Sequence, residues 1–148
     1  MVLEFERIYR VKLPENYISF LKENNGAIPI LKSFTFDNNI YAIEGFLCLL
    51  GDKVNDYDEG DYDIEIVMTR NDSTMCDDAN LVGANIVPIL ALNGGNYVCL
   101  DYRNDESEPE ICIWYWNKSE KFKAFTNKIS NNFEEFLNIL DLGIVEFN

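Results

Sequence analysis

The stretch IVPILALNGGNYVCLDYRNDESEPEICIWYW, from Ile86 to Trp116, decides the fold of this chain. Its three apolar runs are separated by turn signals at residues 93–96 and 103–109. Each run is rich in β-branched and aromatic residues and is too short for an independent helix. Because turns this short cannot contain a crossover helix, we expect three antiparallel strands at the centre of a sheet.

The flanking segments predict helices at both ends of the chain. Residues 4–10 carry apolar side chains at helical spacing, and Pro14 fits the first turn of a second helix that ends at Asn25-Gly26. Near the C-terminus, Asn131 and Glu134 have the spacing of a capping box before a closing helix. The other expected strands are 33–36, 40–50 (joined by a turn at 37–39) and 121–127.

This order of elements indicates an α+β fold. We expect one domain, residues 1–148, in which an antiparallel or mixed sheet carries the N- and C-terminal helices on one side. The segment 62–70 is ambiguous at this level, since Tyr62, Ile64, Ile66 and Met68 alternate as they would in a strand.

Most of the net charge of −14 belongs to the middle of the chain. Residues 52–110 hold 3 basic and 15 acidic side chains, so −12 of the charge lies there. Such a field repels phosphate backbones and anionic membranes and attracts basic partners, so we expect a protein partner and no direct nucleic acid or membrane ligand. No apolar run approaches the roughly 20 residues of a membrane span, and the first residues do not resemble a signal peptide, which favours the cytoplasm.

The sequence offers little for catalysis. It contains no histidine, so no Ser-His or Cys-His pair can form, and residues 93–96 lack the lysine of a phosphate-binding loop. Two carboxylates could hydrolyse a glycoside, but among 26 acidic residues a suitable pair arises by chance. We therefore expect no enzyme and no cofactor.

Two alternatives concern these side chains: a metal site formed by the acidic residues, and a disulfide formed by two of the cysteines. The acidic stretch fails the EF-hand pattern, because a loop beginning at Asp56 has Gly60 at position 5 and Val67 where a glutamate belongs. A looser cation site remains an alternative to a solvated or partner-facing loop. Cys99 and Cys112 are expected to face each other across a hairpin as buried thiols, since the compartment is reducing.

The two tryptophans of the central stretch are two residues apart. Trp114 and Trp116 are therefore expected on one face of a strand, packed in the core against a terminal helix. An exposed aromatic platform for a protein partner is the alternative.

Four segments in this order resemble the SUKH superfamily, which includes fungal Smi/Knr cell-wall assembly regulators and bacterial immunity proteins. They are ERIYRVKLPENYISFLKENNGA from Glu6, IVPILALNGGNYVCLDYR, WYWN and the closing NNFEEFLNIL. The resemblance implies an α+β protein-binding fold without catalysis, a helix over 62–70, and in bacteria the neutralisation of a toxin, often a nuclease. For fungal relatives it implies a regulatory scaffold in cell-wall or signalling pathways.

An acidic inhibitor fits the positive surface with which a nuclease holds phosphate. The expected contact surface combines the acidic loop with the tip of the last hairpin, and tyrosines serve as aromatic anchors. Its residues are Asp56, Tyr57, Asp58, Glu59, Asp61, Tyr62, Asp63, Asp105, Glu106 and Glu108. The alternative for these acids is ordinary solvated loop charge.

Overall fold

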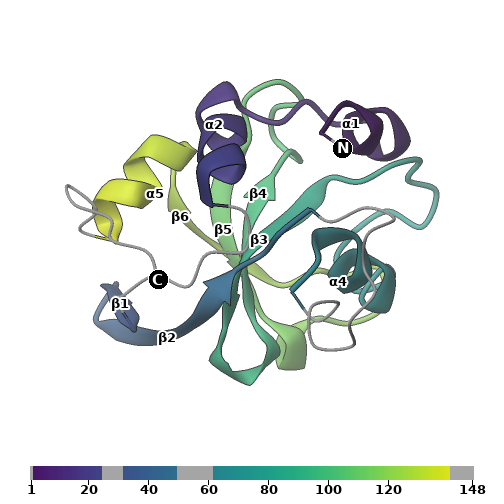
Figure 1. Ribbon diagram of the computed structural model, residues 1–148. Coiled ribbons are helices and arrows are strands. Elements are labelled where there is room, and N and C mark those ends of the chain that lie inside the picture. Colours follow the sequence, from purple (N-terminus) through teal and green to yellow (C-terminus); the bar gives the residue numbers. More distant parts are fainter. Residues whose placement is uncertain (1, 25–31, 50–61, 141–148) are drawn as a thin grey trace.

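The computed structural model describes residues 2–24, 32–49 and 62–140, and these form a six-stranded antiparallel sheet with α-helices on both faces (Figure 1). Every strand pairs with its neighbour in the chain, in the order β1-β2-β3-β4-β5-β6. The α+β class is thus confirmed. The strands are β1 (Ser33–Phe36), β2 (Asn39–Phe46), β3 (Ile86–Leu92), β4 (Tyr97–Asp101), β5 (Glu110–Trp114) and β6 (Thr126–Ser130), and the α-helices are α1 (Val2–Tyr9), α2 (Glu15–Asn24), α4 (Ile64–Arg70) and α5 (Phe133–Ile139).

The three central strands lie where the opening stretch predicts them. All seven residues of β3 are buried, as expected for a strand covered on both faces. The β3–β4 turn uses Gly94 and Gly95, both at φ +83°, a conformation that favours glycine. Cys99 of β4 is directly paired with Cys112 of β5, and both are buried free thiols.

The first hairpin is set by two polar residues with positive φ. Asp37 and Asn38 have φ values of 51° and 64°, which suit the two-residue turn that joins β1 and β2. Beyond the turn, β2 ends at Phe46, earlier than the predicted residue 50, and its register with β3 shifts between Ile43 and Gly45. Such a bulge increases the local twist of the sheet.

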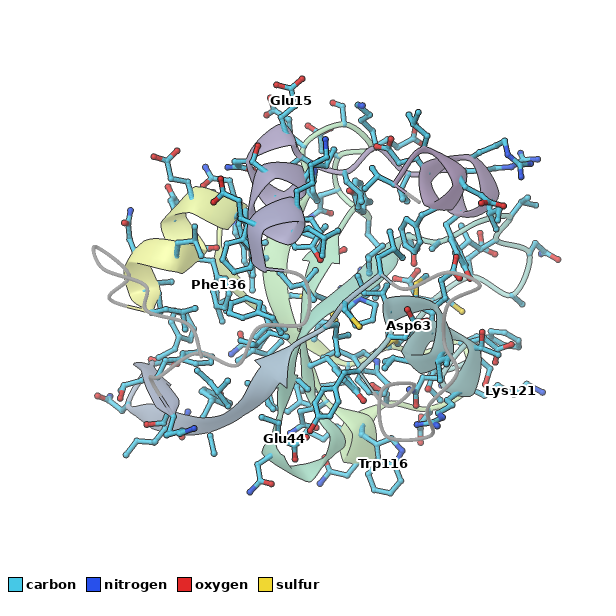
Figure 2. The ribbon with its side chains drawn as sticks, viewed as in Figure 1. Glu15, Glu44, Asp63, Trp116, Lys121 and Phe136 are labelled. Atoms are coloured by element: carbon cyan, nitrogen blue, oxygen red, sulfur yellow. The ribbon has the colours of Figure 1, made fainter. Side chains whose placement is uncertain are left out.

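Helices α2 and α5 cover one face of the sheet. Phe20 of α2 packs on Phe46 of β2, with ring centroids 4.7 Å apart, and Tyr17 meets Phe133 of α5 edge-to-face at 5.2 Å. Phe136 of α5, which is fully buried, reaches Phe34 of β1 at 6.0 Å (Figure 2). Aromatic side chains from both ends of the chain therefore form this half of the core.

The opposite face is covered by α4 and the connector that follows it, residues 71–85. In register, Phe46 aligns through Leu90 and Val98 with Ile113, so the next residue, Trp114, points to the other face. There its indole N–H donates to the carbonyl of Thr74, 2.8 Å away. The N- and C-terminal helices α2 and α5 therefore share one side as expected, but the helices do not all lie on one side, because α4 shields the second face.

The helix over 62–70 implied by the family resemblance is confirmed. Ile64, Val67 and Met68 of α4 are buried, and their i, i+3, i+4 spacing forms one apolar stripe. The alternation that suggests a strand arises because Ile66, on the adjacent side of the helix, is also apolar and half-buried.

Three predictions near the C-terminus require correction. The last strand is Thr126–Ser130 rather than 121–127. The N-cap of α5 is Asn132, whose side chain accepts from the N–H of Glu135 at 2.8 Å, so the capping pair is one residue later than predicted. Trp116 does not share the buried face of Trp114. It begins a 3₁₀ helix, Trp116–Lys118, and is 60% exposed (Figure 2).

Candidate protein-binding surface

The β4–β5 loop presents three acidic side chains on a defined turn. Asp105 Oδ1 accepts from the N–H of Ser107 at 2.8 Å, from its hydroxyl at 2.9 Å and from the N–H of Glu108 at 3.1 Å. These hydrogen bonds, those of Ser107 first, lower the pKa of Asp105, so the carboxylate is firmly ionised at neutral pH. Asp105, Glu106 and Glu108 are all exposed, as the sequence predicts for the hairpin tip.

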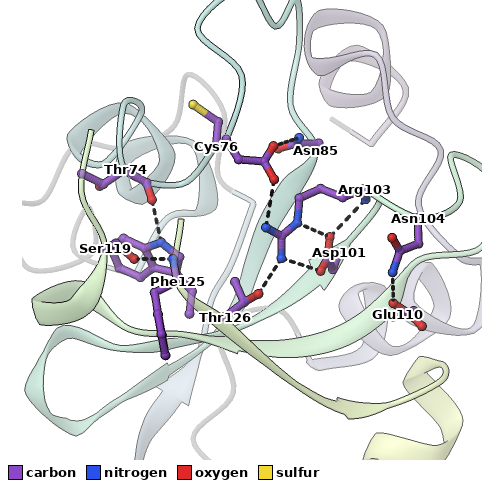
Figure 3. Close-up of polar contacts among 12 residues, drawn as sticks. Thr74, Cys76, Asn85, Asp101, Arg103, Asn104, Glu110, Ser119, Phe125 and Thr126 are labelled. Carbon is purple, nitrogen blue, oxygen red and sulfur yellow. Dashed lines mark hydrogen bonds and ion pairs between the residues drawn. The ribbon is translucent and has the colours of Figure 1, made fainter. Parts of the chain in front are cut away.

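Arg103 anchors the base of this loop (Figure 3). Its guanidinium binds the buried carboxylate of Asp101 through two hydrogen bonds of 2.9 Å each, and Nη1 contacts Asp77 Oδ2 at 3.2 Å. The hydrogen bond with Asp101 raises the pKa of Arg103, so the guanidinium stays protonated. Because this cation is bound to Asp101 and Asp77, it does not neutralise the carboxylates at the loop tip.

Asp63 is not a surface residue. It is 1% exposed, and its Oδ2 accepts from the N–H of Ile66 at 3.2 Å, so it caps α4 (Figure 2). Its assignment to the contact surface is wrong, because this carboxylate is used inside the fold. Tyr62, one residue earlier, is 39% exposed and remains available as an aromatic contact.

The rest of the predicted loop is not described. Asp56, Tyr57, Asp58, Glu59 and Asp61 lie outside the described residues. The described chain nevertheless places the two ends of that segment: Leu49 follows β2, and the carbonyl of Tyr62 accepts from the N–H of Cys48 at 2.7 Å.

The described residues next to the two predicted contact segments lie at the same end of the sheet. Strands β2 and β4 are each antiparallel to β3, so they run in the same direction and their C-terminal ends lie together. The segment after residue 49 continues from β2, and the acidic tip continues from β4.

Two further acidic residues, which sequence reasoning missed, belong to this end. Asp77 and Asp78 are exposed in the connector that leads into β3. The contact between Asp77 and Arg103 ties them to the base of the β4–β5 loop. The available signal was an Asp-Asp pair shortly before a strand that starts at the same end of the sheet. We name the exposed described carboxylates of this end, Asp77, Asp78, Asp105, Glu106 and Glu108, the acidic end.

The opposite end of the sheet carries exposed aromatic side chains. There the exposed Trp116 is held by a hydrogen bond from its backbone N–H to Asn96 Oδ1, at 2.9 Å. The ammonium of Lys118 lies 5.0 Å from the ring centre of Tyr115 and 5.3 Å from that of Phe125, within cation–π range. An open groove of about 490 Å³ runs between the β5–β6 loop and the β1–β2 hairpin.

The described residues contain no cluster of three or more His, Cys, Asp or Glu side chains that could hold a metal ion. The paired thiols at the sheet centre are suited to packing rather than chemistry, since burial raises the pKa of Cys99 well above its ordinary value. In the same part of the chain, no helix has the length and apolarity that a bilayer crossing requires.

An antiparallel meander with helices on both faces and charged loops at one end defines a small α+β domain. The family model SUKH_6, described as SMI1-KNR4 cell-wall, matches residues 1–137. The chain therefore belongs to the SUKH superfamily. Neither the comparison with curated proteins nor the comparison with solved structures found a match.

Proposed function

We propose that this protein is an immunity protein that binds a basic toxin domain, most simply a nuclease, through its acidic end and blocks the toxin's substrate groove. The acidic end is the observation that carries the proposal. Its carboxylates are exposed at one end of a rigid sheet, while Arg103 is already paired with Asp101 and Asp77. Membership of the SUKH superfamily fits such a role.

The physical basis of inhibition would be electrostatic competition for the toxin. A nuclease groove holds phosphates with lysine and arginine, and a fixed array of carboxylates can occupy the same groups. Charge complementarity of this kind accelerates association and makes it sensitive to salt. In this proposal the protein acts in the cytoplasm by binding alone, and it catalyses no reaction.

The direct test is co-expression with the product of a neighbouring toxin-like gene. Rescue of growth and co-purification of a complex are the expected results. If the toxin kills cells with or without this protein and no complex is recovered, the proposal is wrong for that pair.

A charge-neutral triple variant, Asp105→Asn, Glu106→Gln and Glu108→Gln, tests the surface itself. Asparagine keeps the acceptor that organises the turn, so the loop should fold. We expect the association rate constant at low salt to fall on the order of tenfold, with a weaker salt dependence. The matched control neutralises three exposed acids elsewhere, Glu23, Glu44 and Glu120, and should leave the rate nearly unchanged.

The second candidate is a non-catalytic regulatory scaffold, favoured by the opposite end of the molecule. Trp116 and Phe125 are exposed there beside Lys118, and exposed tryptophan is typical of protein contacts. A photo-crosslinking amino acid at position 106 or 116 distinguishes the two candidate functions when the crosslinking is done in the cells that produce the protein. An immunity protein gives a toxin adduct from position 106, whereas a scaffold gives an adduct from position 116 without any toxin.

A further inference from the structure

A cavity of about 380 Å³ opens between α1, α4 and the connector 71–85. Its walls combine apolar and polar side chains from five parts of the chain, and Tyr9 of α1 is one of them. Met68 is contributed by α4, Met75 and Leu81 by the connector, Ile86 by β3 and Phe122 by the β5–β6 loop. The volume lies near the lower limit of small-molecule sites, so the cavity suits one side chain or a small ligand.

The backbone holds this cavity open. Gly83, at φ +93°, passes so close to α1 that a Cβ there would lie 2.4 Å from the carbonyl oxygen of Tyr9. That carbonyl accepts from the N–H of Ala84 at 2.8 Å. On the other side Phe122 has φ 58°, unusual for a bulky residue, and its N–H donates to the carbonyl of Ser73 at 2.6 Å. The walls are therefore fixed by the fold before any ligand arrives.

Two carboxylates line the cavity. Asp72 and Asp78 line it and are exposed, so the charge is at the mouth. Burial raises the pKa of the Cys76 thiol in the wall, and the charges of Asp77, Asp72 and Asp78 raise it further. The pKa of Tyr9 is likewise raised by burial, then by Glu65 and Asp63. An anionic ligand would be repelled from such a site, and a cation would be attracted.

One polar group of the wall lacks a partner. The amide nitrogen of Asn85 faces Asp77 Oδ1 at 3.5 Å, while its buried Oδ1 has no hydrogen-bond partner among the described residues. A buried acceptor without a donor costs free energy. A hydrogen-bond donor that reaches this oxygen would satisfy it.

From the apolar side chains of the walls, an acidic mouth and an unpaired acceptor, we propose that this cavity receives a lysine or arginine side chain of a protein partner. The aliphatic stem would lie against Met68, Met75 and Leu81, and the cationic head would lie among the carboxylates. The inference rests on the proposed function for the partner's identity, a basic toxin. It adds a specific anchor to what is otherwise a diffuse acidic surface, and such anchors in pockets carry most of the free energy of binding.

The site can be tested on the free protein with small probes. N-acetyl-arginine methylamide and N-acetyl-lysine methylamide are titrated into the ¹⁵N-labelled full chain, with the uncharged N-acetyl-norleucine methylamide as the matched control. We expect saturable shifts in the millimolar range at the amides of Ser73, Ala84 and Asn85 for a cationic probe. If neither cation gives saturable shifts there, or if norleucine binds equally well, the inference is wrong.

Two variants sharpen the result. Asp72→Asn with Asp78→Asn should weaken binding of the cationic probe about fivefold or more while leaving the norleucine control unchanged. Glu23→Gln with Glu44→Gln removes two exposed charges that belong neither to the cavity lining nor to the acidic end, and should change probe binding little. Equal weakening by both pairs would overturn the inference, since it would mean attraction by the general field.

The two proposals can fail separately. A toxin complex that forms although the probes do not bind would overturn the cavity and leave the immunity function standing. Probes that bind the cavity while no toxin complex forms would support the cavity as a site for a cationic side chain and contradict the immunity function.

Discussion

The guanidinium of Arg103 binds the carboxylate of Asp101 with two hydrogen bonds of 2.9 Å, across only two residues of the chain. The pair closes the end of β4, and through Asp77 it also ties the connector to the sheet. It thus links the core to the base of the acidic end.

Replacing Arg103 with methionine should destabilise the protein by about 2–3 kcal/mol, because Asp101 would remain buried without its cation. Urea unfolding measures the change. Arg7→Met on the exposed side of α1 is the control and should cost a few tenths of a kcal/mol at most. A cost for Arg103→Met as small as that of the control would mean that Asp101 does not depend on the pair.

Two buried tyrosines should respond oppositely to removal of the hydroxyl. Tyr17 OH is buried and has no hydrogen-bond partner among the described residues, so Tyr17→Phe should be neutral or stabilise by up to about 1 kcal/mol. Tyr102 OH donates to the carbonyl of Lys12 at 2.6 Å, so Tyr102→Phe should cost about 1–2 kcal/mol. Thermal unfolding of the two variants provides the comparison. A clear loss of stability in Tyr17→Phe would reveal a partner for its hydroxyl.

The two tryptophans should differ in both stability and fluorescence. Trp114 is fully buried, so Trp114→Phe should cost about 2–4 kcal/mol through a cavity and the lost hydrogen bond to Thr74. Trp116→Phe should stay within about 0.5 kcal/mol, as is usual for an exposed site. The emission of the protein that retains only Trp114 should lie at shorter wavelength than that of the protein that retains only Trp116. Equal costs would contradict the placement of Trp116 at the surface.

The pair between Glu110 and Lys128 predicts a pH dependence. Its 2.6 Å contact, together with the hydrogen bond from Asn104, lowers the pKa of Glu110 in the folded state. A lowered pKa gives stability that is present above the unfolded value of about 4.3 and is lost as the pH falls through the folded value. Glu110→Gln should therefore be less stable than the parent at pH 7, by a few tenths to 1 kcal/mol for this partly exposed pair.

The same comparison at pH 3 should show a smaller difference, because Glu110 is protonated in the unfolded chain there and the stability from the ionised pair declines as the pH falls toward the folded pKa. Urea unfolding of both proteins at the two pH values measures it. A difference that stays constant with pH would assign the effect to packing rather than to charge.

The parts of the fold that depend on neighbouring residues are predictable from the sequence. The turns at 37–39 and 93–96 fix their hairpins locally, and the pairing of Cys99 with Cys112 follows from the loop between β4 and β5. The position of Trp116 could not be predicted in this way. Its backbone N–H donates to the side chain of Asn96 in the β3–β4 turn, 20 residues earlier, and that distant contact ends the strand.

For the candidate site too, features set by neighbouring residues are predictable from the sequence, and features set by distant contacts are not. An acidic hairpin tip is visible in the sequence because a polar loop between strands must be at the surface. Asp63 looks equally acidic, yet its side chain is used to cap α4, and only the three-dimensional structure separates the two cases. Asp77 was overlooked because its link to Arg103 joins residues 26 positions apart.

The contact between α2 and α5 has a consequence for how the protein is made. A sheet whose strands pair in chain order can form progressively during synthesis, since each new hairpin closes on the strand before it. Tyr17 and Phe20, however, find their partner Phe133 only when the last helix leaves the ribosome. Until then α2 has only the sheet to pack against, so this half of the aromatic core closes when α5 docks.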